Sequence, residues 1–220
     1  MERLYNLSRS KAEITSMQFK RYLFDSIDFS NRMIGIKGAR GTGKTTFLLQ
    51  RLKELPPDSS IFISLDDIYF ADHHLVYVAE EFVRKGGKYL LIDEVHKYPN
   101  WSRELKNIYD NLPGLTVIFT SSSALEIYKG KFDLSRRAVI YDLQGMSFRE
   151  YLNFKYHTGF KAIYLDEILS NRAELYMQIN TVLKPFQYFE SYLQKGYYPY
   201  FIENENSYWI RLNETINQLI

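Results

Sequence analysis

One stretch decides the fold that we expect for this chain of 220 residues: Gly38-Ala39-Arg40-Gly41-Thr42-Gly43-Lys44-Thr45. It fits the pattern of a glycine, four free positions and then Gly-Lys-Ser/Thr, which is typical of loops that bind phosphate groups. Backbone N–H groups must turn inward around the anion in such a loop, and glycine permits both the dihedral angles and the close approach. The alternative is a glycine-rich turn that happens to precede a Lys-Thr pair.

The sequence on either side of this loop supports phosphate binding. The apolar run Met33-Ile34-Gly35-Ile36 before it predicts a buried strand. After it, Leu48, Leu52 and Leu55 follow the i, i+4, i+7 spacing of a helix that packs on a sheet. A phosphate can sit at the N-terminus of that helix, where backbone N–H groups lack partners within the helix.

We therefore expect the loop and the first turn of the helix to hold the phosphates of a nucleoside triphosphate. Lys44 would reach the β- and γ-phosphates, and the hydroxyl of Thr45 would bind Mg²⁺. The residues expected to contact the nucleotide are Gly38, Ala39, Arg40, Gly41, Thr42, Gly43, Lys44, Thr45 and Thr46.

A second stretch, Lys88-Tyr89-Leu90-Leu91-Ile92-Asp93-Glu94, places two acids at the end of an apolar run. Such a run predicts a strand that is buried on both faces, and acids directly at its end are costly unless they have a cation or a catalytic task. Asp93 has the place of the acid that holds Mg²⁺, and Glu94 has that of the carboxylate that orients the attacking water. An apolar run that ends in Asp-Glu is a weak signal of a nucleotide site by itself. Downstream of a complete phosphate loop it favours the functional interpretation.

Three further apolar runs predict strands, at residues 60–65, 115–119 and 138–143. With the two strands already named they make five, separated by helical or turn segments. This alternation indicates a doubly wound α/β domain.

Hydroxyl side chains follow the strand at 115–119, in Thr120-Ser121-Ser122-Ser123. We expect Ser122 or Ser121 to contact the γ-phosphate or the lytic water. Ser123 is placed to cap a following helix, in a capping box with Glu126.

The two ends of the chain predict helices rather than strands. Residues 1–32 indicate one or two short helices, and Phe19, Arg21 or Tyr22 there would either cover an adenine ring or pack against the sheet edge.

The pattern changes at Met146, after which no further β run occurs. Ser147-Phe148-Arg149-Glu150 predicts a capping box, and helices are expected near 163–182 and 185–195. We therefore expect a nucleotide domain over residues 1–145 and a helical lid over residues 146–220.

The composition excludes several classes of protein. Lys and Arg total 28 against 26 Asp and Glu, so the net charge of +2 gives no global reason to bind nucleic acid, although a local basic groove stays open. The absence of cysteine excludes disulfides and thiolate metal sites. No apolar run approaches the roughly 20 residues of a membrane helix, and the N-terminus lacks a secretion signal. We expect a cytoplasmic protein.

Five stretches spread over most of the chain make it similar to one family. They are Gly-Ala-Arg-Gly-Thr-Gly-Lys-Thr at 38–45, Ile-Asp-Glu-Val-His-Lys-Tyr-Pro-Asn-Trp at 92–101, Thr-Ser-Ser-Ser at 120–123, Met-Ser-Phe-Arg-Glu-Tyr-Leu at 146–152 and Tyr-Leu-Gln-Lys-Gly-Tyr-Tyr-Pro at 192–199. On these stretches the chain resembles the AAA-type P-loop ATPases of prokaryotes, in the AAA+ superfamily. Full-length members carry a C-terminal domain of unknown function with a nuclease-like fold.

The resemblance implies a parallel sheet of five strands in the order 5-1-4-3-2, a helical lid, and ATP with Mg²⁺ as substrate. It lends Arg137 the position of an arginine that often reaches the γ-phosphate of a neighbouring subunit, which implies a homo-oligomer. A surface arginine paired with an acid explains Arg137 equally well. Relatives usually have glycine where Ser121 and Arg136 stand, so the choice between Arg136 and Arg137 stays open. The nuclease-like domain would follow Ile220.

Two functions are carried forward. The first is a Mg²⁺-dependent, ATP-hydrolysing motor or switch with Glu94, Lys44, Arg137 and Ser122 as catalytic residues. The second is an ATP-gated scaffold that turns over little and binds a protein or DNA partner. Transfer of a phosphoryl group to a small molecule is disfavoured because Glu94 would activate water. Specificity for GTP is disfavoured because no guanine-reading Asn-Lys-x-Asp sequence occurs.

Overall fold

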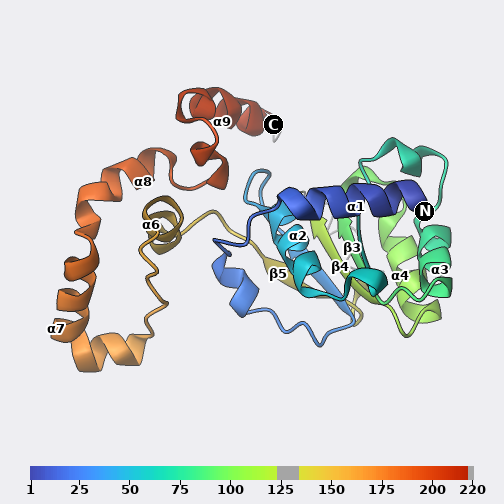
Figure 1. Cartoon of the computed structure of the whole chain (residues 1–220), viewed down its shortest axis with the longest axis horizontal. Helices are drawn as coiled ribbons and strands as arrows, with labels where there is room; N and C mark the ends of the chain where they lie inside the picture. The colour runs from blue at the N-terminus through green and yellow to red at the C-terminus, as the bar shows by residue number, and fades with distance from the viewer. Residues whose placement is uncertain (123–133, 218–220) are drawn as a thin grey trace. The chain divides into compact units, whose positions relative to one another are not determined.

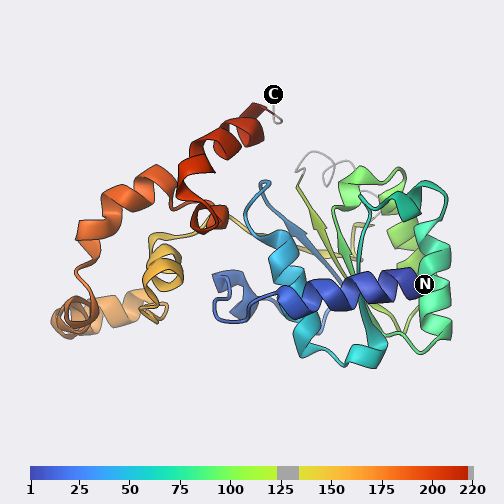
Figure 2. The same ribbon diagram turned by 45° about the horizontal axis from the view of Figure 1, so that its top comes forward.

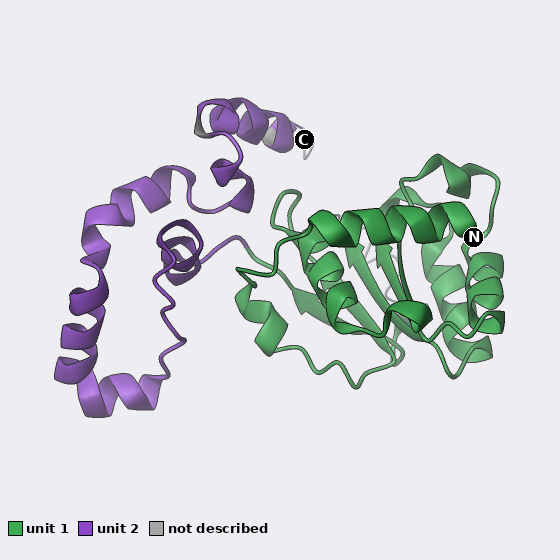
Figure 3. Ribbon diagram, viewed as in Figure 1, with its two compact units in different colours: residues 1–144 green, residues 145–220 purple. Residues whose placement is uncertain are grey.

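The structure of the chain is a computed structural model that describes residues 1–122 and 134–217 (Figure 1). The chain divides into two compact units, Met1–Gln144 and Gly145–Ile220 (Figure 3). The first unit contains the sheet, and the described elements of the second are helices.

A sheet of five parallel strands forms the centre of the first unit (Figure 2). The strands are β1 (Met33–Lys37), β2 (Ser60–Ser64), β3 (Tyr89–Asp93), β4 (Thr116–Ser121) and β5 (Val139–Asp142). Their order is β2-β3-β4-β1-β5, and all neighbouring pairs are parallel. This is the expected order 5-1-4-3-2 counted from the other margin, so the predicted α/β class and strand order are confirmed.

Helices cover both faces of the sheet. The helices of this unit within the described residues are α1 (Glu2–Ile14), α2 (Lys44–Glu54), α3 (Leu75–Arg84) and α4 (Trp101–Asn111). Because side chains alternate between faces along a strand, Leu90 and Val117 join a buried cluster with α3 and α4, whereas Leu91 and Ile118 join one with α2. The phosphate loop therefore connects a buried strand to a helix that is fixed on the sheet.

Helix α1 lies along the margin strand β2. Its Leu4 packs into the cluster beneath α3 and α4, and its Ala12 packs against the cluster beneath α2. Between them the hydroxyl of Ser8 accepts a hydrogen bond from the backbone N–H of Phe62, at 2.9 Å. The helix thus satisfies a donor that a margin strand would otherwise leave without a partner in the sheet.

The second unit is a chain of helices. They are α6 (Phe148–Tyr156), α7 (Leu165–Val182), α8 (Phe189–Lys195) and α9 (Tyr208–Asn217). The predicted capping box of Ser147 and Glu150 begins α6, with both of its hydrogen bonds present. The helix expected near 185–195 is wrong at its start, where Pro185–Tyr188 forms a 3-10 turn and the α-helix begins at Phe189.

Other 3-10 turns connect the longer elements, at Tyr22–Asp25, Pro57–Ser59, Ile68–Ala71, Val95–Lys97, Pro199–Ile202 and Glu205–Ser207. Across the described ranges, no helix combines the length and apolar character needed to cross a membrane.

Candidate functional site

The phosphate loop joins β1 to α2, and its glycines each have a structural reason. Gly41 and Gly43 adopt φ of 84° and 92°, which side chains other than glycine rarely tolerate. At Gly38 a Cβ would lie 2.3 Å from the carbonyl oxygen of Leu143, so the close approach of two backbones requires glycine there. The loop conformation therefore depends on the residues that the motif specifies.

Lys44 is the first residue of α2, and its side chain crosses the loop. Its Nζ donates to the carbonyl oxygens of Gly38 and Ala39, each at 2.9 Å. Burial lowers the pKa of Lys44 to about 8, and the nearby carboxylates of Glu94 and Asp93 act in the opposite direction. The ammonium group is thus held among carbonyl oxygens at the place where the motif puts phosphate.

Asp93 ends β3 and faces two hydroxyls. Its Oδ2 accepts a hydrogen bond from Thr45 Oγ1 at 2.7 Å, and its Oδ1 accepts one from Thr120 Oγ1. Burial raises the pKa of the Asp93 carboxyl group, and the hydrogen bonds from Thr120 and Thr45 oppose that shift. A hydroxyl and a carboxylate in contact form an oxygen donor set of the kind that Mg²⁺ prefers, so Thr45 and Asp93 fit that ion.

Glu94 follows in a strained backbone conformation, with φ 55° and ψ 44°. Its Oε1 accepts a hydrogen bond from Ser122 Oγ at 2.8 Å, and its Oε2 lies 3.3 Å from His96 Nε2. The backbone N–H of Glu94 donates to Thr120 Oγ1 at 3.2 Å. The Glu94 carboxylate is therefore held by groups that follow β3 and β4. It lies at the same edge of the sheet as the phosphate loop.

The structure brings together five of the expected site residues at the carboxyl ends of the strands: Lys44, Thr45, Asp93, Glu94 and Ser122. Of the alternatives for the polar contact, Ser122 reaches Glu94, whereas Ser121 is buried in β4 beside Lys37. Ser123 and Glu126 lie outside the described residues.

The expected arginine lies elsewhere. Arg137 precedes β5, so it stands at the edge where the strands begin, opposite the phosphate loop. Its guanidinium group donates to both carboxylate oxygens of Asp110, each at 2.9 Å. Arg136 beside it is exposed and has φ 65°.

Two residues that the sequence analysis named, Thr120 and Arg21, make contacts that it did not assign to them. Thr120 contacts both Asp93 and the backbone of Glu94, and its signal was a hydroxyl at the end of a strand that neighbours β3. Arg21 is buried, and its guanidinium group donates to the backbone carbonyl groups of Thr42 and Gln144.

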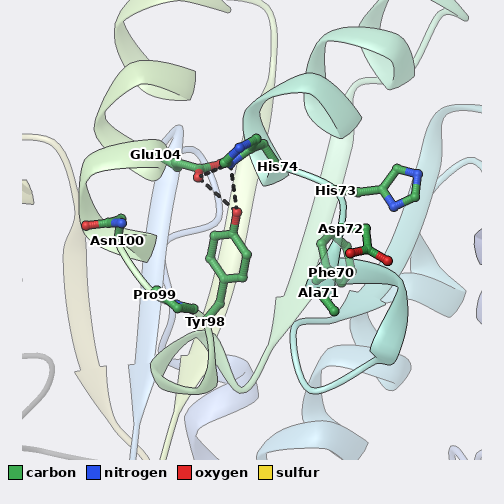
Figure 4. A pocket seen from close by; sticks show the side chains of 9 residues that line it. All are labelled: Phe70, Ala71, Asp72, His73, His74, Tyr98, Pro99, Asn100 and Glu104. Carbon is green, nitrogen blue, oxygen red and sulfur yellow. Dashed lines mark hydrogen bonds and ion pairs between the residues drawn. The ribbon is translucent and has the colours of Figure 1, made fainter.

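A separate pocket of about 300 Å³ lies beyond β2 and β3 (Figure 4). It is lined by Phe70, Ala71, Asp72, His73, His74, Tyr98, Pro99, Asn100 and Glu104. The Glu104 carboxylate accepts hydrogen bonds from the Tyr98 hydroxyl and from the backbone N–H of Val76 in the first turn of α3, each at 2.9 Å. Glu104 therefore caps α3 from α4. Burial, together with the hydrogen bond to Glu104, raises the pKa of Tyr98 to about 12.

Comparison with known proteins gives a family for the site. A family model described as an AAA domain matches residues 30–152, which include the phosphate loop and the Asp93-Glu94 pair. Two curated relatives come from Methanocaldococcus jannaschii. The uncharacterized protein MJ1637 is 31% identical over 79% of this chain and 39% of its own length. The uncharacterized protein MJ1544 is 27% identical over 70% of this chain and 35% of its own length. The chain thus spans less than two fifths of the length of each.

Solved structures with some likeness include PCH-2 of C. elegans, at 17% identity and a TM-score of 0.43 over 77% of this chain and 51% of that one. They also include AMPPCP-bound DnaA of Aquifex aeolicus, at 17% identity and a TM-score of 0.40 over 77% of this chain and 56% of that one.

Proposed function

Because this chain belongs to the AAA domain family, we propose that it binds ATP with Mg²⁺ and hydrolyses it as a motor or switch. One observation carries the proposal. The Thr45 hydroxyl and the Asp93 carboxylate meet at 2.7 Å, with the Lys44 ammonium group and the Glu94 carboxylate on the same edge of the sheet. A cation, a metal ligand pair and a base are the groups that phosphoryl transfer to water needs.

The phosphates would be held by the loop. Lys44 Nζ would exchange its bonds to the Gly38 and Ala39 carbonyl groups for bonds to phosphate oxygens. Thr45 and Asp93 would hold Mg²⁺, which when bound neutralises charge on the phosphate oxygens. Exclusion of solvent strengthens the attraction between the Lys44 ammonium group and the triphosphate.

Glu94 would act as the base. Its carboxylate would accept a hydrogen bond from a water molecule and so align that water with the γ-phosphate. Ser122 already donates to Oε1, so it would hold Glu94 in place while the second oxygen engages water. Ser122 would therefore position Glu94, and Glu94 would be the catalytic residue.

The test is Glu94→Gln, which keeps the shape of the side chain and removes its basicity. We expect ATP binding, measured by calorimetry, to persist while steady-state hydrolysis falls by about 100-fold or more. Glu13→Gln, at an exposed position of α1, is the matched control and should behave as the wild type.

Unchanged hydrolysis by the Glu94 variant would overturn the assignment. A wild-type chain that binds ATP yet shows no single turnover, with or without DNA, would favour the ATP-gated scaffold instead. Three points stay predictions: a protein or DNA partner, an assembly in which Arg137 acts across subunits, and a nuclease-like domain beyond Ile220.

A further inference from the structure

The buried Arg21 connects three separate parts of the first unit. It directly precedes the 3-10 turn at Tyr22–Asp25, and only 5% of it is exposed. One guanidinium nitrogen donates to the Thr42 carbonyl oxygen in the phosphate loop, and the other donates to the Gln144 carbonyl oxygen at 2.6 Å. A charged group is costly to bury, so these contacts give the side chain a defined task.

The segment that holds the second contact is itself fixed. The backbone N–H of Leu143 donates to the Lys37 carbonyl oxygen at 2.7 Å, and the Tyr22 hydroxyl donates to the Asp142 carbonyl oxygen at 3.1 Å. The Gln144 carbonyl group is therefore a firm anchor. Since Arg21 is bonded to it, the guanidinium group cannot follow the loop if the loop shifts.

Thr42 is held from its other side as well. Its backbone N–H and its hydroxyl both donate to the Ala39 carbonyl oxygen, at 3.4 and 2.9 Å, and the residue is fully buried. Ala39 thus holds the Gly41–Thr42 peptide and the Thr42 side chain, and Arg21 holds the carbonyl group of the next peptide, Thr42–Gly43.

Peptide geometry transmits this constraint to the phosphate site. In a trans peptide the C=O of one residue and the N–H of the next point in opposite directions. Because the Thr42 carbonyl group points to Arg21, the N–H of Gly43 points away from Arg21. The guanidinium charge also polarises this peptide group, which makes its N–H a stronger donor.

We propose that Arg21 is a positioning residue for the nucleotide: it fixes the Thr42–Gly43 peptide so that the loop amide is directed at the phosphates before they bind. The inference rests on the proposed function. It assigns Arg21 to the phosphates that ATP and ADP share, and not to the adenine ring. Orienting the amide in advance lowers the entropic cost of binding. The loss of Arg21 therefore weakens the binding of ATP and of ADP to the same extent.

The test compares Arg21→Met, which removes both donors, with Arg21→Lys, which keeps the charge. The matched control is Arg9→Met, the same change at an exposed position of α1. Dissociation constants for ATP and ADP are measured by calorimetry at a temperature where circular dichroism shows each variant folded, and kcat and KM are measured beside them.

We expect Arg21→Met to weaken the binding of ATP and of ADP by about tenfold or more each. We expect kcat to change less than about threefold, because the loop makes the same interaction in the ground state and in the transition state. Arg21→Lys should fall between the wild type and Arg21→Met, and Arg9→Met should match the wild type. If Arg21→Met does not fold, Arg21→Lys carries the test with the same two nucleotides.

A folded Arg21 variant that binds both nucleotides as the wild type does, even with a lower melting temperature, would leave Arg21 a purely structural role and overturn the inference alone. A wild-type chain that binds neither nucleotide would overturn the proposed function and this inference with it.

Discussion

At the scale of single residues, the charge of Lys44 is set by its surroundings. Burial lowers its pKa to about 8 from the 10.5 of a free lysine, so the folded protein releases this proton at a lower pH than the unfolded chain does. Between about pH 8 and 10.5 the unfolded chain binds more protons here than the folded chain does. Lys44 by itself therefore makes the free energy of unfolding rise with pH in that window.

Bound phosphate should reverse this shift, because it stabilises the ammonium form. We expect ATP binding at pH 8 to take up about half a proton, and the affinity to fall as the pH rises through about 8. Calorimetry in two buffers of different ionisation enthalpy measures the uptake. Lys44→Arg stays charged throughout and should lack this uptake. A wild-type affinity that is constant from pH 7 to 9 would contradict the prediction.

The residues of the site differ in how far sequence alone could place them. The closeness of Thr45 and Asp93 could be expected, since a motif after β1 and an acid after β3 share one edge of a parallel sheet. Thr120 needed the pairing of β3 with β4, and Arg21 needed contacts across 21 and 123 positions of the chain. No local pattern carries such separations, and the roles of all these residues stay proposals.

At the scale of elements, the hydroxyl of Ser8 bonds α1 to the backbone of β2. Ser8→Ala would leave the buried N–H of Phe62 without its acceptor, which we expect to lower the free energy of unfolding by about 1–3 kcal/mol. Urea denaturation followed by circular dichroism measures the change.

Ser10→Ala, on an exposed position of the same helix, is the control for the loss of a hydroxyl. Equal stability of the two variants would show that the bond from Phe62 contributes nothing.

Elements with a strong apolar period were predictable, and their exact starts were not. The strands have continuous apolar runs, and the order of the sheet followed from the family resemblance. The start of α8 was missed because Pro185 suits the first position of a 3-10 turn and of an α-helix alike, and Pro185–Tyr188 forms the 3-10 turn.

At the scale of the whole molecule, Arg137 stands at the sheet edge opposite its own phosphate loop. A role at a phosphate would therefore require the site of another copy. We expect the specific ATPase rate of the wild type to rise with protein concentration and Arg137→Ala to remove that rise, since an arginine acting in this way contributes about 10³ to 10⁵ in rate. Steady-state hydrolysis over a range of concentrations measures it.

Asp110→Ala breaks the same ion pair but keeps the arginine, so it should retain the rise. Arg136→Ala tests the neighbouring arginine in the same way. If the Arg137 and Asp110 variants behave alike, Arg137 serves only as the partner of Asp110.

The two margins of the sheet differ in a way that matters when molecules crowd together. At β2 a helix covers the strand, whereas at β5 the side chains of Val139 and Ile140 are 40% and 37% exposed and β1 is the neighbour among the described strands. Among the described residues of the first unit no strand lies on the outer side of β5, and such a margin is a template along which an extended segment of another chain can align its backbone. Within the described part of the first unit, pairing with a further strand is therefore open at the β5 margin and hindered at the β2 margin, where α1 lies.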